Sequence, residues 1–202
     1  MARNTLNYYR NHSLQFFENT VNVDMTVLYD AFLKYLPAQG KILDLGCGSG
    51  RDTKYFHDQG YQVEAVDYAL ELVQLAQSYT GLPIRYESFY DLKDWQSYDG
   101  IWACASLLHC ERDELYNVMN RIVNALKITG ICYLSFKYGT QDRVVNERAF
   151  TDLDEDQAQD LFKAFKHIEL IKIWQTSDQR ADRQETWLNI LFRKVNDKVL
   201  CG

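Results

Sequence analysis

The chain has 202 residues, 47% of them hydrophobic, which is enough for one domain with a single core. Its formal net charge of −6 and its lack of a basic cluster argue against a nucleic-acid partner, because such binding needs Lys and Arg side chains that neutralise phosphates. No apolar run reaches the ~18 residues of a membrane span, and the N-terminus has no apolar signal segment, so we expect a cytoplasmic protein with no membrane partner.

Two helices are predicted before the first strand, over residues 7–19 and 24–36. Asp24 is the expected N-cap of the second helix, and Pro37 ends it. From residue 42 onward, apolar runs alternate with amphipathic segments, which predicts a parallel sheet covered by helices on both faces. The predicted strands are 42–45, 61–67, 84–87, 100–105 and 131–137, and the predicted helices are 51–59, 69–79 and 111–126.

The last third of the chain departs from this alternation. A helix is predicted over 154–165, followed by strands over 168–174 and 186–192 that are joined by a polar stretch with no helical pattern. Such a connection makes a hairpin, so the final strand should be antiparallel. We therefore expect an α/β fold: a doubly wound, seven-stranded, mostly parallel sheet in a single domain (1–202), with residues 1–37 as an N-terminal helical cap and 38–202 as the core.

The five cysteines contain no Cys-x-x-Cys pair, and their number is odd, which favours reduced thiols over a disulfide framework. The four histidines are scattered without the spacing of metal ligands, so no metal site is predicted.

A glycine-rich loop follows the first predicted strand of the sheet, in the pattern Asp44-x-Gly46-x-Gly48-x-Gly50. Glycine lacks a Cβ and adopts positive φ readily, so such a turn lets the backbone lie against a small cofactor. The spacing differs from the G-x-G-x-x-G of dinucleotide-binding proteins, although NAD stays an alternative. Asp67 ends the second strand, 21 residues after Gly46, where a carboxylate can accept both hydroxyls of a ribose.

Together with the C-terminal hairpin, these motifs resemble those of the class I S-adenosylmethionine-dependent methyltransferases, whose fold is Rossmann-like. The resemblance implies that the loop holds the methionine part of S-adenosylmethionine, that Asp67 binds its ribose, and that Asp91 and the Tyr90 backbone contact its adenine. The residues placed at the cofactor in this way are Tyr9, Asp44, Gly46, Gly48, Arg51, Asp67, Tyr68, Tyr90, Asp91 and Ala103.

A closer resemblance concerns the tellurite-resistance methyltransferase branch, through Gly50-Arg51-Asp52, Tyr90-Asp91 and the polar stretch 178–183. That branch carries an arginine directly after the loop and a His/Arg pair in the C-terminal hairpin loop. Arg183, the last residue of this stretch, matches the arginine of the pair. The histidine position falls near Gln175 or Thr176, so the histidine is missing here. A tellurite or selenite acceptor is therefore an alternative.

In open α/β sheets the ligand lies beyond the carboxyl ends of the strands, which selects the acceptor candidates. His109 can act as a general base, because the pKa of imidazole is near neutral, or it can cap the following helix. Lys137 can orient an anionic group or pair with a carboxylate. Arg148, Arg180 and Arg183 can bind a carboxylate or oxyanion, or can be solvated charges. We predict catalytic roles for His109, Lys137 and Arg183.

The N-terminal helix places Tyr9, Phe16 and Phe17 on one face, which either packs against the sheet edge or forms a lid over the cofactor. The function predicted is methyl transfer from S-adenosylmethionine to a small polar molecule by direct displacement. A non-catalytic S-adenosylmethionine-binding protein and an NAD-dependent oxidoreductase are the alternatives. We expect a monomer or homodimer with a small-molecule substrate, since no further domain is present to bind a protein or a nucleic acid.

Overall fold

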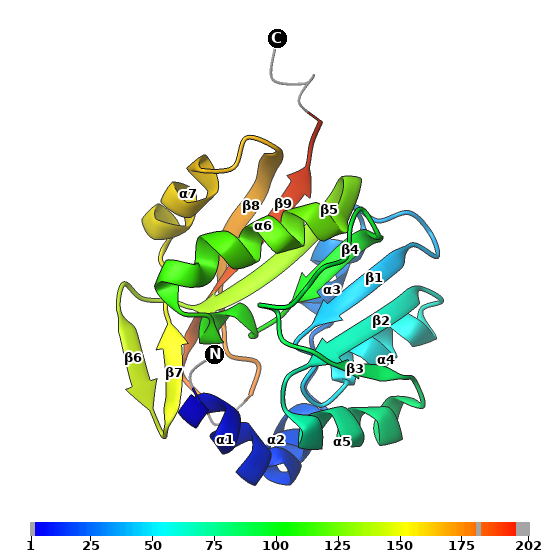
Figure 1. The fold of residues 1–202 in the computed structure, drawn as a ribbon, viewed down its shortest axis with the longest axis vertical. Helices are drawn as coiled ribbons and strands as arrows, with labels where there is room; N and C mark the ends of the chain where they lie inside the picture. The colour runs from blue at the N-terminus through cyan, green and yellow to red at the C-terminus, as the bar shows by residue number, and fades with distance from the viewer. Residues whose placement is uncertain (1–2, 181–182, 197–202) are drawn as a thin grey trace.

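The computed structural model of the chain describes residues 3–180 and 183–196. Its centre is a seven-stranded sheet in the order β3-β2-β1-β4-β5-β9-β8, with helices on both faces (Figure 1). Neighbouring strands from β1 to β5 are parallel, whereas β9 is antiparallel to both β5 and β8. The strands are β1 (Lys41–Leu45), β2 (Gln62–Asp67), β3 (Ile84–Tyr86), β4 (Tyr98–Ala103), β5 (Leu126–Lys137), β8 (Ile168–Ser177) and β9 (Thr186–Lys194). The predicted α/β class and the reversed last strand are confirmed.

The helices cover the sheet in two layers. The α-helices are α1 (Arg3–Asn11), α2 (Ser13–Thr20), α3 (Thr26–Leu33), α4 (Arg51–Asp58), α5 (Leu70–Thr80), α6 (Leu115–Ala125) and α7 (Glu155–Lys163). On one face, Phe32 of α3 and Phe56 of α4 pack against Trp102, with ring centroids 5.2 and 5.4 Å apart. On the other face α6 and α7 bury their apolar sides, for example Phe162 against Phe192. Among the described helices, none has both the length and the apolar character that crossing a membrane requires.

The strand β1 explains why the sheet is buried on both sides. Its residues Ile42 and Leu43 point to opposite faces, and both are fully buried. A strand covered on both faces reads as a continuous apolar run, as the sequence does here. At its end the chain turns sharply, because the backbone N–H groups of Gly46 and Cys47 both donate to the carbonyl of Val66 on β2. This anchors the glycine-rich loop at the carboxyl edge of the sheet.

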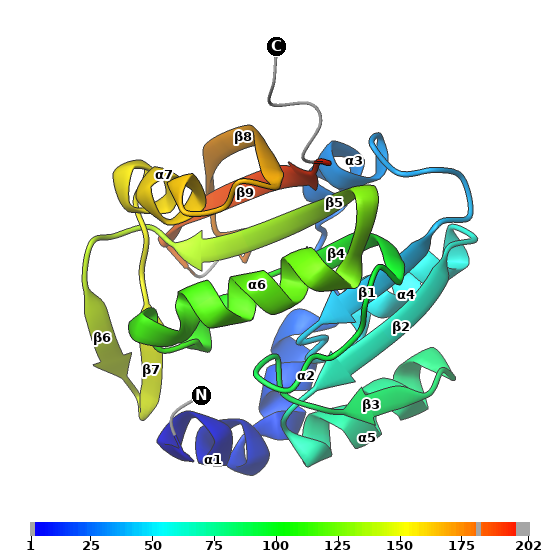
Figure 2. The same cartoon turned by 45° about the horizontal axis from the view of Figure 1, so that its top comes forward.

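The N-terminal segment differs from the prediction in two respects. The first helix is divided at His12 into α1 and α2, which lie along the edge to which β1, β2 and β4 point (Figures 1 and 2). The helix α3 begins at Thr26, whose N–H donates to Asp24 Oδ1 over 2.9 Å, so Asp24 lies just before the helix. The helix α3 buries Leu28 and Phe32 in the core, whereas α1 and α2 lie along the edge of the sheet (Figure 1).

A second, two-stranded sheet was not predicted. It pairs β6 (Asp142–Val145) with β7 (Arg148–Thr151) and lies between β5 and α7 in the chain. Its turn residues Asn146 and Glu147 both have positive φ, as two-residue hairpin turns require. Without a glycine at the turn and with only four residues in each strand, the usual hairpin signals are absent. The hairpin contacts the N-terminal helices, since Ala149 N donates to Thr5 Oγ1 over 2.9 Å.

The cysteines of the described residues, Cys47, Cys104, Cys110 and Cys132, are free thiols. Cys201 lies outside the described residues.

Candidate active site

Two adjoining cavities lie at the carboxyl edge of the sheet. The smaller is bounded by the glycine-rich loop, the end of β2 and the helices α1 and α2. The larger extends from the same loop past the ends of β4, β5 and β9 to the hairpin of β6 and β7, and it holds about 1050 Å³ of empty space. The residues that line both cavities are Tyr9, Phe16, Gly46, Gly48, Ala105 and His109. The two spaces therefore meet above the glycine-rich loop.

The glycine-rich loop presents bare backbone to both cavities. Gly46 and Gly48 have φ of +86° and +55°, a region that side chains other than glycine rarely adopt. A Cβ on Gly48 would lie 3.0 Å from the ring of Phe16, and one on Gly46 would lie 2.5 Å from Ser106 Cβ. Both predicted loop residues thus line the cavities, and a side chain at either position would clash with Ser106 or Phe16.

Asp67 joins the loop to the smaller cavity. Its Oδ2 accepts from Gly48 N over 2.9 Å, and its Oδ1 accepts from Ala69 N over 2.8 Å. Burial raises the pKa of this carboxyl group, while the backbone N–H groups around it act in the opposite direction. Asp67 and Tyr68 both line the smaller cavity, together with Glu87. The structure thus brings two predicted cofactor residues to the position that the motif indicated.

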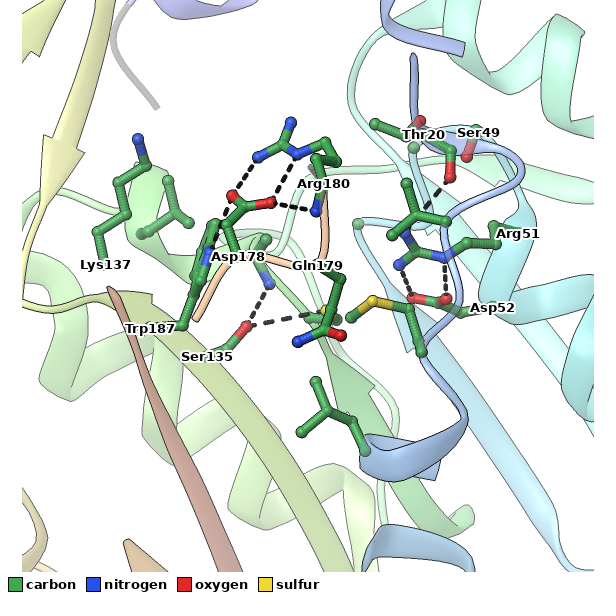
Figure 3. Close-up of a pocket in the computed structure, with 18 of the residues that line it drawn as sticks. Thr20, Ser49, Arg51, Asp52, Ser135, Lys137, Asp178, Gln179, Arg180 and Trp187 are labelled. Atoms are coloured by element: carbon green, nitrogen blue, oxygen red, sulfur yellow. Dashed lines mark hydrogen bonds and ion pairs between the residues drawn. The ribbon is translucent and has the colours of Figure 1, made fainter. Parts of the chain in front are cut away.

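A buried ion pair forms one end of the larger cavity (Figure 3). Arg51 donates to both carboxylate oxygens of Asp52, over 2.6 and 2.9 Å. Trp102 Nε1 and the Tyr29 hydroxyl also donate to Asp52. Although burial opposes ionisation of Asp52, the guanidinium and these hydrogen bonds hold its pKa below the usual range. Asp52 therefore stays ionised, and Arg51 is fixed with its guanidinium at the cavity.

Asp44 has a different environment from its neighbour Asp52. It is buried, accepts a hydrogen bond from Thr53 Oγ1 over 2.6 Å and lines neither cavity. Burial, reinforced by the negative charge of Asp52, raises the pKa of Asp44 to about 8. The surroundings of Asp44 thus disfavour its ionised form, and its predicted contact with the cofactor stays a prediction.

The opposite end of the larger cavity carries a second group of charges (Figure 3). Lys137 Nζ lies 2.5 Å from Glu185, so the structure has the carboxylate pairing that was one of its two predicted roles. Arg180 donates to both carboxylate oxygens of Asp178, over 2.9 and 2.6 Å. Burial lowers the pKa of Lys137, and the charge of Glu185 opposes this. Lys137 and Arg180 both line the cavity as ion-paired groups.

Trp187 and Arg183 complete this end of the larger cavity. Trp187 Nε1 donates to Asp178 Oδ2 over 3.1 Å, which ties the indole to the ion pair of Asp178. Arg183 lines the cavity from the connection between β8 and β9, as the sequence predicted for an acceptor-side residue.

His109 lies between the two cavities and is held at both ring nitrogens. Nδ1 is 2.8 Å from the carbonyl of Ala149, and Nε2 is 2.7 Å from the hydroxyl of Tyr9. A carbonyl oxygen only accepts, so Nδ1 carries the hydrogen and Nε2 accepts from Tyr9. Burial lowers the pKa of His109 to about 4, which keeps the imidazole neutral at neutral pH. Tyr9 and His109 therefore form a hydrogen-bonded pair at the junction.

Besides Asp44, three further predicted cofactor residues line neither cavity: Tyr90, Asp91 and Ala103. The Tyr90 hydroxyl accepts from the backbone N–H of Glu111 over 3.1 Å. Ala103 is fully buried within β4, and it is Ala105 beyond the strand end that reaches the cavities. The predicted adenine contacts at Tyr90 and Asp91 stay predictions.

Ser135 is a cavity residue that the sequence analysis missed. Its Oγ accepts from Ala105 N over 2.7 Å and so fixes the turn after β4. A usable signal was present, because Ser135 precedes Lys137 by two residues in a strand and must share its face.

Comparisons with known proteins agree with this geometry. A family profile described as "Methyltransferase domain" matches residues 42–130, which run from β1 into β5. An uncharacterized methyltransferase of Staphylococcus carnosus is 26% identical over 156 residues, covering 69% of this chain and 75% of the relative. The malonyl-[acyl-carrier protein] O-methyltransferase of Salmonella typhimurium is 28% identical over 162 residues, covering 72% of this chain and 63% of the relative.

The fold itself has a solved counterpart. The structure of 1,6-didemethyltoxoflavin-N1-methyltransferase from Burkholderia thailandensis, with bound 1,6-didemethyltoxoflavin and S-adenosylhomocysteine, superposes with a TM-score of 0.77. The match covers 96% of this chain and 87% of that chain at 22% sequence identity. At this level of identity the likeness concerns the fold.

Proposed function

We propose that the chain is a class I S-adenosylmethionine-dependent methyltransferase and that it transfers a methyl group to a small polar molecule by direct displacement. The observation that carries this proposal is the meeting of two cavities above Gly46 and Gly48. A cofactor held on the loop would lie at the junction, with the larger cavity left for an acceptor. A concave acceptor cavity set among strand ends, a hairpin and helices favours a small molecule over a macromolecule.

The residues of this edge fit the cofactor. A Cβ at Gly48 would meet the Phe16 ring at 3.0 Å, so glycine is needed for the bare backbone of the loop to form the cavity wall beside Phe16. Asp67 and the loop would hold the nucleoside, and the guanidinium of Arg51 would face the anionic end of the cofactor. When bound, S-adenosylmethionine supplies a methyl group on a positively charged sulfur.

The chain's own contribution to transfer would be positioning, exclusion of water and one proton path. Tyr9 and Phe16 lie beside the loop, with ring centroids 5.2 Å apart, where they would limit the access of water to a bound cofactor. The Tyr9 hydroxyl donates to His109 Nε2. When a bound acceptor gives a proton to Tyr9 Oη, Tyr9 can transfer its own hydroxyl proton to His109 Nε2.

The alternatives receive less support. Gln175, near the missing histidine of the tellurite-resistance branch, donates to Glu155 and does not line the cavity. Thr176 lines the cavity but carries no imidazole. A non-catalytic binding protein would be expected to have a filled acceptor site, whereas the larger cavity is open.

The proposal is tested by following tritium from S-adenosyl-L-[methyl-³H]methionine into a panel of small polar molecules, alongside calorimetric titrations with S-adenosylhomocysteine and with NADH. We expect S-adenosylhomocysteine to bind, NADH not to bind, and at least one acceptor to be labelled. Tight binding of NADH alone would overturn the proposal. Cofactor binding without transfer to any acceptor would favour the non-catalytic alternative.

A further inference from the structure

The larger cavity is lined by more positive than negative charge. Its cationic side chains are Arg51, Lys137, Arg148, Arg180 and Arg183. Arg51, Lys137 and Arg180 form ion pairs with carboxylates. For Arg148 and Arg183, by contrast, no carboxylate within residues 3–180 or 183–196 comes within 4.0 Å. Arg183 is exposed, so Arg148 is the half-buried cation left without a counter-charge.

Arg148 is held in place although no carboxylate of the described residues forms an ion pair with it. It is the first residue of β7, and its guanidinium lies 4.4 Å from the ring centroid of Tyr8 and 5.2 Å from that of Phe150. Such cation–π contacts stabilise the side chain, and they are stronger where water is excluded. The Nε atom is buried and has no hydrogen-bond partner in the part of the chain that the structure describes. The side chain is thus fixed with an unused donor.

The position of Arg148 is on the acceptor side of the junction. It lines the larger cavity only, whereas Gly46 and Gly48 line both. Lys137 approaches the same Phe150 ring, with its ammonium 4.5 Å from the centroid. The two cations therefore flank Phe150 near the Tyr9–His109 pair.

We propose that the methyl acceptor is a small organic anion and that Arg148 binds its anionic group, a carboxylate or another oxyanion, beside the Tyr9–His109 pair. This inference rests on the proposed function, since it concerns the acceptor of that reaction. A neutral acceptor could accept hydrogen bonds from the guanidinium but would cover it without a counter-charge, which is costly for a desolvated charge. A carboxylate supplies both the counter-charge and the two oxygens that an arginine binds side by side.

An anion bound to Arg148 would also change the basicity of His109 in the proton path. Burial is the main reason why the pKa of His109 is low, and the positive charges of Arg148 and Lys137 lower it further. An anion bound to Arg148 offsets part of that positive charge, so His109 becomes a better base when the acceptor is present. The acceptor would then assist its own deprotonation.

The test uses benzoate as the anionic probe and benzamide as its neutral match, because aromatic residues Phe150 and Trp187 line the cavity. Both are titrated by calorimetry into the full chain saturated with S-adenosylhomocysteine. The variants are Arg148→Met, Arg148→Lys and the control Arg193→Met. Arg193 is paired with Glu169 and lies at the opposite end of β9 from the cavity.

We expect wild-type protein and Arg193→Met to bind benzoate at least tenfold more tightly than benzamide. Arg148→Met should lose this preference, Arg148→Lys should keep part of it, and both should bind S-adenosylhomocysteine within threefold of wild type. The inference is overturned if wild-type protein shows no preference for benzoate, or if a folded Arg148→Met variant keeps it. A loss of S-adenosylhomocysteine binding in Arg148→Met would also overturn it, by assigning Arg148 to the cofactor. Failure of wild-type protein to bind S-adenosylhomocysteine would instead refute the proposed function.

Discussion

Replacing Asp67 by alanine removes a carboxylate that faces the smaller cavity and also holds the glycine-rich loop. Each of its oxygens accepts one backbone N–H, from Gly48 over 2.9 Å and from Ala69 over 2.8 Å. An ionised carboxylate has about four lone-pair sites, so about two remain for the hydroxyl groups of a ribose. The Asp67→Ala variant therefore loses both predicted contacts with the cofactor at once.

The magnitude follows from these contacts. Hydrogen bonds to a charged group contribute ~1.5–3 kcal/mol each, but water replaces part of the loss at an open cavity, so we expect a net loss of ~1–3 kcal/mol. At 1.4 kcal/mol for each factor of ten, the dissociation constant for S-adenosylhomocysteine should rise ~5- to 150-fold. The two backbone N–H groups left behind face a cavity that water enters, so their effect on folding should stay near ~1 kcal/mol.

Isothermal titration calorimetry with S-adenosylhomocysteine measures this change, and thermal unfolding followed by circular dichroism shows whether the variant is folded. Asp58→Ala is the matched control, because Asp58 lies at the end of α4 and is exposed and paired with Lys54. The control should bind as wild type does. An unchanged affinity in a folded Asp67→Ala variant would refute the assignment of Asp67 to the ribose.

Three further predictions concern the loop and the buried ionisable groups. Gly48→Val should abolish S-adenosylhomocysteine binding by calorimetry while the protein stays folded, since φ is +55° and the new Cβ meets Phe16 at 3.0 Å; normal binding would place the ligand away from the loop. Because burial raises the pKa of Asp44 to about 8, while an unfolded aspartate titrates near ~4, stability should fall as pH rises between these values. Asp44→Asn keeps an acceptor for Thr53 but cannot titrate. From pH 4 to pH 8, its free energy of unfolding in urea should therefore rise relative to that of wild type by more than ~1 kcal/mol. An equal pH dependence of the two proteins would contradict this. Burial lowers the pKa of His109 in the folded protein to about 4, so the stability of wild type should fall as pH drops from ~6.5 to 4. The stability of His109→Gln should fall less steeply. If the urea midpoints of the two proteins change with pH to the same extent, His109 is not buried as described.

The sequence predicted the layered fold well because apolar periodicity directly reflects burial. Ile42 and Leu43 are apolar neighbours because β1 is covered on both faces, and the polar connection after residue 174 indicated the hairpin that reverses β9. The hairpin of β6 and β7 was missed because its turn at Asn146 and Glu147 carries no glycine signal and its strands are short.

Individual site residues were harder to predict than elements, because their roles depend on burial and on distant partners. Asp44 and Asp67 both end strands of the sheet, yet Asp44 turns to Thr53 inside the core and Asp67 faces the smaller cavity. The partner of Lys137 is Glu185, 48 residues later in the chain, a contact that only the folded sheet creates. Arg148, the half-buried cavity arginine for which the described residues supply no carboxylate, could be identified only after the other cations had been paired.

The proposed methyl transfer requires a nucleoside cofactor that lies across the glycine-rich loop. A crystal structure of the chain with S-adenosylhomocysteine tests this most directly. We predict that the ribose hydroxyls lie within hydrogen-bond distance of Asp67 and that the sulfur lies at the junction of the two cavities, near Tyr9 and His109. Density for the ligand away from Gly46 and Gly48, or a sulfur facing away from the larger cavity, would contradict the proposed reaction.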